Sequence, residues 1–431
     1  MSKKFLKPAD ATAIVKKSIK KRRAKDSRLK LYGRFAVGLA TCFLLFLFYT
    51  IFEKGTPGFF QYYVTLDVNF DKERIDPKGD LSDNSLFSGD ASKIVNEALF
   101  ILIEPKGRKE KKEAKKIISS GKDVRIAKMV KQNPNLFGTI TKVKFALDDD
   151  IDSFLRGYIK RETPENERRV NDNVIKFIDK LNAEGRISYN FSDYILSGSA
   201  SGNPEMAGIK GAFVGSILTL FVCLLIAFPL GVATAIYLEE IAKKNKITEF
   251  IEVNINNLAA VPSVVFGIMG LAIFIGIFGM PRSIPLVGGM VLALMTLPTI
   301  IISSRAAIRA VPPSVRDAAL GIGASKLQTI FHHVIPLAMP GMLTGTIIGM
   351  AQALGETAPL LMIGMVAFIV DVPNSVVDPG TVLPVQIFMW ADFAERMFVQ
   401  KTSAAIIVLL TFLISMNAFA IYLRKKLERR W

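Results

Sequence analysis

The sequence predicts an α-helical integral membrane protein with six transmembrane helices and a small α+β extracytoplasmic domain between spans 1 and 2. Three observations predict this class. Half of the 431 residues are hydrophobic, and six apolar runs reach spanning length. Almost all of the formal net charge of +17 lies in four of the segments outside these runs. A helix needs about 20 apolar residues to cross the hydrocarbon core. The six runs are residues 35–52, 212–238, 258–278, 284–303, 337–370 and 404–423.

The distribution of charge orients these runs. If the N-terminus is cytoplasmic, the cytoplasmic segments hold 25 basic and 8 acidic residues, and the segments left outside hold 30 basic and 29 acidic. An excess of Lys and Arg on the cytoplasmic side is the rule for such proteins. We therefore expect a multi-pass membrane protein with both termini in the cytoplasm. The cytoplasmic segments are residues 1–34, 239–253, 304–336 and 424–431.

Residues 1–34 form a basic cytoplasmic segment, and residues 35–52 form the first transmembrane anchor. This anchor is longer than the apolar region of a usual signal peptide, and no A-x-A cleavage site follows it, so we expect it to stay uncleaved. The basic run Lys16–Lys30 is interpreted as a determinant of topology that contacts anionic membrane lipid, rather than as a nucleic-acid-binding segment. Cys42 and Cys223 both fall in spans, so a structural disulfide is not expected.

Residues 53–208 form an insert that is long enough to be a domain of its own. Apolar and polar residues alternate over Val64–Asp71 and again over Ile187–Tyr194, which is typical of half-buried strands. Between them, Val170, Val174, Phe177, Ile178 and Leu181 share one face of a predicted helix with Gly185 as its stop. The stretch SGSASGNPE, residues 197–205, is typical of a flexible tether back to the membrane.

No motif in the insert has the spacing of an active site. Asp148–Asp152 lacks the spaced oxygen ligands and the turn glycine of a calcium loop, so a solvated acidic turn is expected there. The run Lys106–Lys116 is mixed in sign, as in an exposed helix or loop. The sequence therefore gives an architecture for the insert but leaves its role open.

The most informative cytoplasmic segment is residues 310–336, within a region 209–431 that contains the other five spans. Pro312 and Pro313 end the preceding helix, and a short helix is predicted to start near Ser314. Small residues let a partner approach the backbone closely, and Gly323 permits a sharp bend. A short helix exposed below a membrane bundle can transmit motion from a cytoplasmic protein.

This loop is similar to the EAA coupling motif of ABC-transporter permeases, which docks into a cleft of an ATPase subunit. Asp317 stands where the family usually has Glu, while His333 and Ile335 replace its usual Ile and Leu. The residues that match the motif are Ala318, Ala319, Gly323 and Pro336. Further stretches resemble phosphate-importing permeases, in order along residues 208–431: FPLGVATAIYLEEIA, VPSVVFGIMGLA, LMTLPTIIISS and GETAPLLMIG.

The resemblance implies the type I ABC-importer permease fold and a set of partners. These are a second, related permease in a heterodimer, two ATPase subunits and an extracytoplasmic phosphate-binding protein. No G-x-x-x-x-G-K-[ST] loop occurs in the sequence, so ATP and Mg are expected on the ATPase and not on this chain. No catalytic residue is predicted. No metal site is predicted either, because the adjacent His332 and His333 lack metal-ligand spacing. The chain is therefore interpreted as a translocation subunit and not as an enzyme.

A carboxylate in the fifth run marks the candidate substrate pathway. Glu356 lies within an apolar run, and charged residues there are costly and usually functional. The glycines at 341, 345 and 349 are explained by helix packing, but that packing does not explain a carboxylate. Pro359 removes a backbone hydrogen bond, so irregular backbone is expected nearby. The predicted pathway residues are Gln352, Glu356, Thr357 and Pro359.

Glu356 is expected to hold a cation on the path of an anionic substrate. Many related permeases have Arg four residues earlier, where this chain has Gln352, so the cation comes from the partner permease or from another span. Proton-linked titration of Glu356 is the alternative role. The function predicted from the sequence is import of inorganic phosphate. The alternatives are import of another oxyanion or small solute by the same fold, and a membrane sensor with an extracytoplasmic ligand domain.

Overall fold

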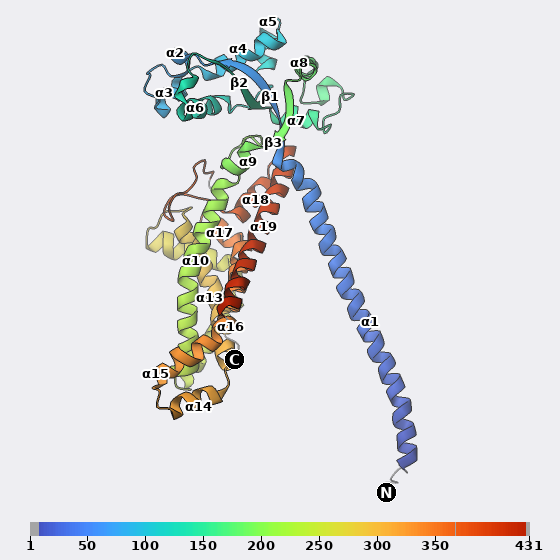
Figure 1. The fold of residues 1–431 in the computed structure, drawn as a ribbon, viewed down its shortest axis with the longest axis vertical. Helices are drawn as coiled ribbons and strands as arrows, with labels where there is room; N and C mark the ends of the chain where they lie inside the picture. The colour runs from blue at the N-terminus through green and yellow to red at the C-terminus, as the bar shows by residue number, and fades with distance from the viewer. Residues whose placement is uncertain (1–7, 367, 428–431) are drawn as a thin grey trace. The chain divides into compact units, whose positions relative to one another are not determined.

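The computed structural model describes residues 8–366 and 368–427, and the chain divides into two compact units between Lys54 and Gly55. The first unit is formed by helix α1 (Pro8–Gly55) (Figure 1). The predicted anchor, residues 35–52, lies within this helix, and its large apolar side chains, such as Phe35 and Phe43, are exposed. Exposed apolar residues over a spanning length favour burial of this part of α1 in lipid.

The second unit begins with a three-stranded antiparallel sheet, as the alternating stretches predict. Its strands are β1 (Phe60–Asn69), β2 (Ile140–Ala146) and β3 (Ile187–Phe191), in the order β2-β1-β3. Leu66 pairs with Val143 across one edge of β1, and Tyr62 pairs with Tyr189 across the other. The strands predicted from Val64–Asp71 and Ile187–Tyr194 are confirmed, whereas β2 was not predicted.

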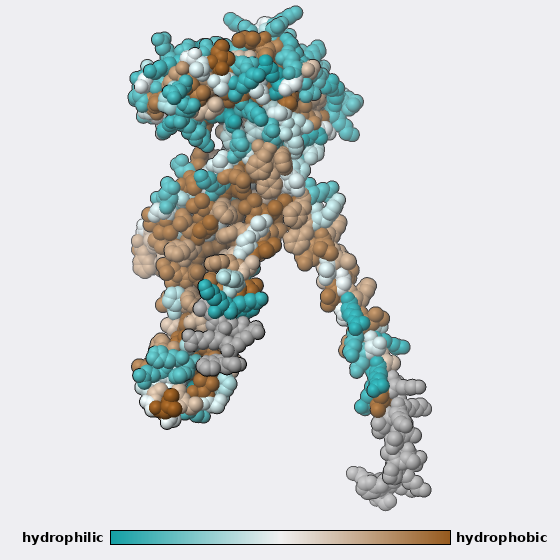
Figure 2. Space-filling model, in the orientation of Figure 1, coloured by the Kyte–Doolittle hydropathy of each residue, from teal (hydrophilic) through white to brown (hydrophobic). Residues whose placement is uncertain are grey.

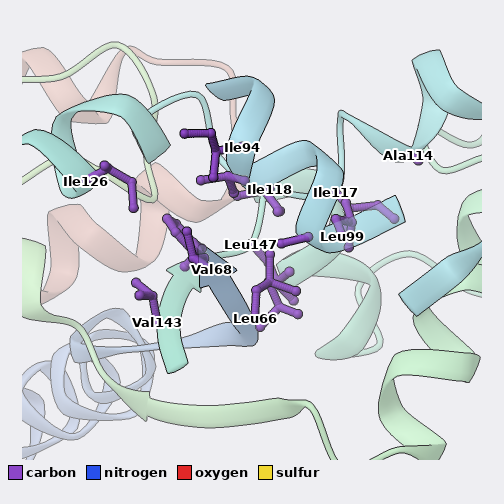
Figure 3. Packing of buried hydrophobic residues seen from close by; sticks show 14 of the residues in the cluster. Leu66, Val68, Ile94, Leu99, Ala114, Ile117, Ile118, Ile126, Val143 and Leu147 are labelled. Carbon is purple, nitrogen blue, oxygen red and sulfur yellow. The ribbon is translucent and has the colours of Figure 1, made fainter. Parts of the chain in front are cut away.

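Helices cover this sheet and enclose a hydrophobic core (Figure 3). Leu66 and Val68 of β1 pack against Ile94 and Leu99 of helix α4, and all four are buried. The predicted helix after residue 170 is α8, which buries the expected apolar face, and Gly185 follows it with a φ of +67°. The helices are α2 (Lys72–Ile75), α3 (Asp83–Ser88), α4 (Ala91–Ile103), α5 (Gly107–Ala114), α6 (Lys122–Gln132), α7 (Asp149–Leu155), α8 (Asp172–Ala183) and α9 (Asp193–Ser197).

Two expectations for the insert are wrong. The acidic stretch 148–152 starts helix α7 rather than a solvated turn, and Asp152 is only 1% exposed because it pairs with Arg156. The stretch 197–205 is packed rather than a flexible tether, since Glu205 is 2% exposed and accepts a 2.6 Å hydrogen bond from Ser119. Both corrections involve partners far away in the sequence, since Asp152 also accepts a hydrogen bond from Tyr62 N at 2.8 Å and Glu205 accepts from Ser119.

The rest of the second unit is a helical bundle centred on α13 (Pro285–Arg309), which packs against α10 (Lys210–Ile236) and α16 (Ile335–Gly355). Figure 2 shows a hydrophobic surface over the bundle and a mainly hydrophilic one over the sheet region. The remaining elements are the π-helical turns Tyr237–Ile241, Leu271–Ile277 and Thr329–Val334, the short 3-10 turns Thr56–Phe59, Pro134–Leu136 and Glu165–Glu167, and α11 (Lys246–Ala259), α12 (Ser263–Gly270), α14 (Pro313–Gly321), α15 (Lys326–Gln328), α17 (Ala358–Met362), α18 (Leu383–Ala391) and α19 (Arg396–Leu427).

The predicted run 258–278 is not one straight helix. Among the described residues, five helices are long and apolar enough to span, and a sixth span requires counting α11 with the helix Ser263–Ile277, which meet at 102°. The run 337–370 is also interrupted, because α16 ends at Gly355. Helix α10 has 27 residues, so it is about 40 Å long and separates the sheet region at its start from the α14 loop near its end.

Candidate functional site

The loop between α13 and α16 begins with helix α14, which starts at Pro313, close to the predicted Ser314. Its C-terminus is closed by two backbone hydrogen bonds, from Gly323 N to Leu320 O at 2.9 Å and from Ala324 N to Ala319 O at 3.0 Å. This pair of bonds is the Schellman motif, which places a residue in the left-handed region. Gly323 occupies that position with a φ of +91°, as the predicted bend requires.

A capping box starts the next helix two residues after Gly323. The Ser325 hydroxyl accepts from Gln328 N at 3.2 Å, and the Gln328 side chain accepts from Ser325 N at 2.8 Å. This reciprocal arrangement satisfies backbone donors that a helix start otherwise leaves open. The chain then continues as one helix from Lys326 to Gly355, so α14 is joined to the pathway helix by a tightly hydrogen-bonded turn.

The predicted coupling residues divide between a cavity and the exposed surface around it. Ala318, Ala319 and Pro336 line a cavity of about 610 Å³ between α14 and the start of the following helix. Ala319 is buried and Pro336 is half-buried, whereas Asp317 and Gly323 are exposed and do not line it. His332 and His333 also line the cavity, and no group of three His, Cys, Asp or Glu residues in the described chain could hold a metal ion.

One ion pair connects α14 to the bundle in the described chain, and it was not predicted from the sequence. Arg316 on α14 contacts Glu240 at 2.6 Å and donates to the carbonyl oxygens of Val311 and Ile308 at 2.8 and 3.0 Å. The adjacent Glu239 pairs with Arg305 at 2.5 Å. The sequence does contain a signal for these pairs, because Glu239 and Glu240 follow one apolar run and Arg305 follows another.

The predicted pathway residues lie where helix α16 breaks. Helix α16 ends at Gly355, and Glu356 adopts an extended conformation with φ −77° and ψ 128°. Thr357 precedes the short helix α17, whose second residue is Pro359. The fifth apolar run therefore contains irregular backbone at the predicted carboxylate, as expected.

Helix packing accounts for two glycines on α16, Gly341 and Gly345. A Cβ atom added at Gly345 would lie 1.7 Å from the Ser303 hydroxyl oxygen of α13, and one added at Gly341 would lie 2.5 Å from Ala307 Cβ. Such close approach between helices needs small residues. The packing role predicted for these glycines is confirmed.

The four pathway residues have different surroundings. Pro359 is buried, and a Cβ atom added at Gly267 of α12 would lie 2.6 Å from its Cα. Gln352 is exposed, while Glu356 and Thr357 are half-buried. Within the described part of the chain, the side chains of Gln352 and Glu356 have no hydrogen-bond or ion-pair partner.

Comparison with protein families matches two parts of the chain. Residues 227–431 match the family described as "Binding-protein-dependent transport system inner membrane component". Residues 16–165 match a domain of unknown function, DUF3333. The first match contains the whole α14 loop and the break at Glu356.

Curated relatives align over the C-terminal part of the chain. The phosphate transport system permease protein PstA of Yersinia pestis is 30% identical over 226 residues, which is 52% of this chain and 75% of the relative. The probable ABC transporter permease protein YqgI of Bacillus subtilis is 34% identical over 181 residues, covering 42% of this chain and 60% of the relative. The phosphate transport system permease protein PstA 1 of Mycobacterium tuberculosis is 33% identical over 36% of this chain, which spans only 51% of that relative.

Solved structures with a similar arrangement include the MetNI methionine ABC transporter in inward facing conformations. It has a TM-score of 0.42 and 16% identity, and the match covers 51% of this chain and 96% of that one. A bacterial alginate ABC transporter with a periplasmic protein bound to an alginate pentasaccharide matches with a TM-score of 0.39 and 14% identity, over 51% of this chain and 78% of that chain.

Proposed function

The chain belongs to the family of inner-membrane components of binding-protein-dependent transport systems, and we propose that it is a permease subunit of an ABC importer for inorganic phosphate. The α14 loop is the observation that carries this proposal. Leu320, Ile322 and Phe331 are 50%, 83% and 57% exposed beside the 610 Å³ cavity. Apolar side chains exposed together at one site are typical of a protein–protein contact.

In this proposal the partner at the loop is an ATPase. The chain has no phosphate-binding G-x-x-x-x-G-K-[ST] loop, so two ATPase subunits bind ATP and Mg and supply the energy. The chain itself is a translocation subunit without a catalytic residue. The exposed Asp317 and Gly323 at the edge of the cavity contact the ATPase, and Ala318, Ala319 and Pro336 shape the surface that receives it.

Motion of α14 would reach the spans through two routes. The first is covalent, through the capped turn at Gly323 and Ser325 into the helix that ends at Gly355. The second is the ion pair between Arg316 and Glu240, which joins α14 to the π-helical turn Tyr237–Ile241 directly after α10. Because a capped turn and a partly buried ion pair both resist deformation, a displacement of α14 would move α10 and α16 together.

The break at Glu356 is proposed as part of the phosphate path. Non-helical backbone at membrane depth is tolerated where it is buried in protein or lines a water-filled cavity. Glu356 has no cation partner among the described residues, and Gln352 is exposed one turn earlier. Both side chains are available to a second, related permease, whose Arg or Lys would pair with Glu356 and contact the anion.

The proposed topology has six spans, with the bent pair counted as one, in a bacterial inner membrane with both termini cytoplasmic. The insert is then extracytoplasmic, where an extracytoplasmic phosphate-binding protein delivers substrate. A Ser120→Cys variant in a Cys42→Ser background tests this, because Ser120 is exposed and the remaining Cys223 is buried. We expect an impermeant thiol reagent to label intact spheroplasts. Labelling only after lysis would mean that the insert is cytoplasmic. The α14 loop would then lie outside the cytoplasm, where it cannot contact the ATPase.

The function is tested by reconstituting the purified complex with its binding protein in proteoliposomes. We expect phosphate to stimulate ATP hydrolysis and to accumulate inside, with sulfate at the same concentration as the control anion. Stimulation by sulfate alone would assign another oxyanion to the same fold. Ligand binding without transport or stimulated ATP hydrolysis would favour a membrane sensor and contradict the importer.

A further inference from the structure

Helix α11 has an apolar face that remains exposed. Its large apolar side chains recur at the spacing of one face of a helix: Ile247, Phe250, Ile251 and Leu258. Ile247 and Phe250 are 71% and 69% exposed, and the other two are each 39% exposed. Asn254 lies on the same face, but its amide donates to Phe250 O of the same helix at 2.7 Å. Large apolar side chains gathered on one exposed face mark a contact with a membrane or with another protein.

The polar face of α11 is joined to the bundle by an ion pair. Glu252 contacts Arg305 of α13 at 2.7 Å, and Arg305 also contacts Glu239 at 2.5 Å. Since Arg305 lies about one turn before the end of α13, α11 lies at the same end of the bundle as the α14 loop. Residues two apart on a helix point to opposite sides, so the pair at Glu252 turns Phe250 away from the bundle.

The direction of α11 and the lysines at its start favour a membrane as the partner. Helix α11 meets the following helix, Ser263–Ile277, at 102°. In the proposed topology that second helix crosses the bilayer, so α11 runs nearly parallel to the membrane plane at the cytoplasmic end of the bundle. Lys243, Lys244 and Lys246 at the start of α11 are exposed. An amphipathic helix with lysines beside its apolar face binds at the boundary of headgroups and acyl chains, and each lysine is attracted to anionic headgroups.

We propose that α11 is a lipid-binding helix: its apolar face inserts at the level of the headgroups, and its three lysines bind anionic lipid, such as phosphatidylglycerol, in the cytoplasmic leaflet. The competing occupant of this face is a second permease. Protein–protein interfaces are depleted in lysine, whereas anionic headgroups attract it, so the lysines favour lipid. The choice of leaflet rests on the proposed function, because an inverted topology would bring the same helix to the other leaflet.

The test locates α11 with nitroxide spin labels in the purified complex, reconstituted without ATP into liposomes of phosphatidylcholine and phosphatidylglycerol. Phe250→Cys places a label on the apolar face, and Asn256→Cys places one on the opposite, exposed face. Each is made in a Cys42→Ser background that retains the buried Cys223. Oxygen is concentrated among the acyl chains, whereas a nickel chelate stays in water. We expect the ratio of oxygen to nickel collisions to be at least about threefold higher at position 250 than at position 256.

Two outcomes of this measurement would overturn the proposal. Ratios typical of water at both positions would mean that α11 does not contact lipid. Shielding of position 250 from both reagents would assign the apolar face to the second permease. The measurement requires neither transport nor ATP hydrolysis, so its failure is distinguishable from failure of the proposed import function.

The role of the lysines is tested in the same liposomes with the triple variant Lys243→Gln, Lys244→Gln and Lys246→Gln. We expect it to lower the collision ratio at position 250 about twofold, and liposomes of phosphatidylcholine alone should lower the ratio of the unsubstituted protein to the same extent. The matched control removes three exposed lysines from α5 and should leave the ratio unchanged: Lys109→Gln, Lys111→Gln and Lys112→Gln. Size-exclusion chromatography establishes that each complex is assembled. A ratio that does not respond to phosphatidylglycerol, or an equal loss in both triple variants, would contradict binding of anionic lipid by these lysines.

Discussion

The two ends of the helix Lys326–Gly355 differ in how the backbone is terminated. At its start, two Schellman hydrogen bonds end α14 and a capping box at Ser325 begins the next helix. Together they satisfy backbone groups that helix ends otherwise leave unpaired. At its end, the only backbone hydrogen bond from Glu356 N is 3.3 Å long, to Ala353 O. Helix ends without such caps depend on water, ligands or partners. In the proposed function, the first end transmits the motion of α14, and the second changes shape or contacts another molecule.

The largest expected effect is at the open end. Glu356→Gln keeps the volume of the side chain but removes its charge, which would leave a cation of the partner permease buried and unpaired. Breaking a buried pair in this way typically costs about 3–5 kcal/mol. Since about 1.4 kcal/mol corresponds to a factor of ten in rate, phosphate uptake should fall at least tenfold while assembly is preserved.

This is measured as radiolabelled phosphate uptake in cells that rely on this transporter, with membrane level and ATPase association determined in parallel. Glu249→Gln is the matched control, because Glu249 is exposed on α11 and far in sequence from the break. Normal uptake by Glu356→Gln would exclude a charge-dependent role. Loss of assembly together with uptake would make Glu356 a structural residue.

The next effect is at the capped end. Gly323→Val places a β-branched residue at a φ of +91°, which should cost about 1–2 kcal/mol and open the turn. Gly323→Asn should be milder, since Asn tolerates left-handed backbone. No described side chain of this chain lies within 4 Å of a Cβ added there, so strain and contact with a partner can be separated.

The readout is the amount of ATPase that co-purifies, together with the ratio of ATP hydrolysed to phosphate transported. Gly323→Val is expected to lose most of the ATPase, and Gly323→Asp should lose it as well because it adds charge at the contact. If Asn, Val and Asp variants all co-purify and transport normally, the loop is not the dock.

A smaller effect is expected at the ion pair that links α14 to the π-helical turn after α10. Arg316 and Glu240 are 25% and 11% exposed, so they are only partly screened by solvent. Arg316→Gln and Glu240→Gln should each reduce phosphate-stimulated ATP hydrolysis about threefold to tenfold. In a double-mutant cycle, the double variant should be no worse than the more severe single variant. Additive losses would mean that the two residues act independently.

The smallest effect concerns the insert and depends on pH. Burial and the neighbouring carboxylates Asp150 and Glu205 raise the pKa of Asp149 to about 7, so the folded chain holds this proton more tightly than the unfolded chain does. Its contribution to stability is therefore lost as the pH rises from about 4 towards 7. Asp149→Asn should raise the melting temperature by about 3 °C at pH 8 and by less at pH 5, as measured by intrinsic fluorescence. An equal shift at both pH values would contradict this.

Several features follow from the sequence alone because their causes are local. Alternating residues around Leu66 predict β1, the apolar face from Val174 to Leu181 predicts α8, and Pro313 predicts the start of α14. The bend at Gly323 and the packing of Gly345 are also local, since each depends on a small side chain at that position. The apolar runs predict a helical membrane protein for the same reason.

Other features were decided only by the tertiary structure, because they depend on residues that are distant in the chain. Strand β2 has a mixed pattern and exists through its pairing with β1. Asp152 is buried in a strongly acidic stretch because the distant backbone N–H of Tyr62 donates to it at 2.8 Å, in addition to its local ion pair with Arg156. The pair between Arg316 and Glu240 requires elements that meet only in the folded chain. Periodicity reports which face of an element is apolar, but it contains no information about which distant side chain satisfies a buried charge.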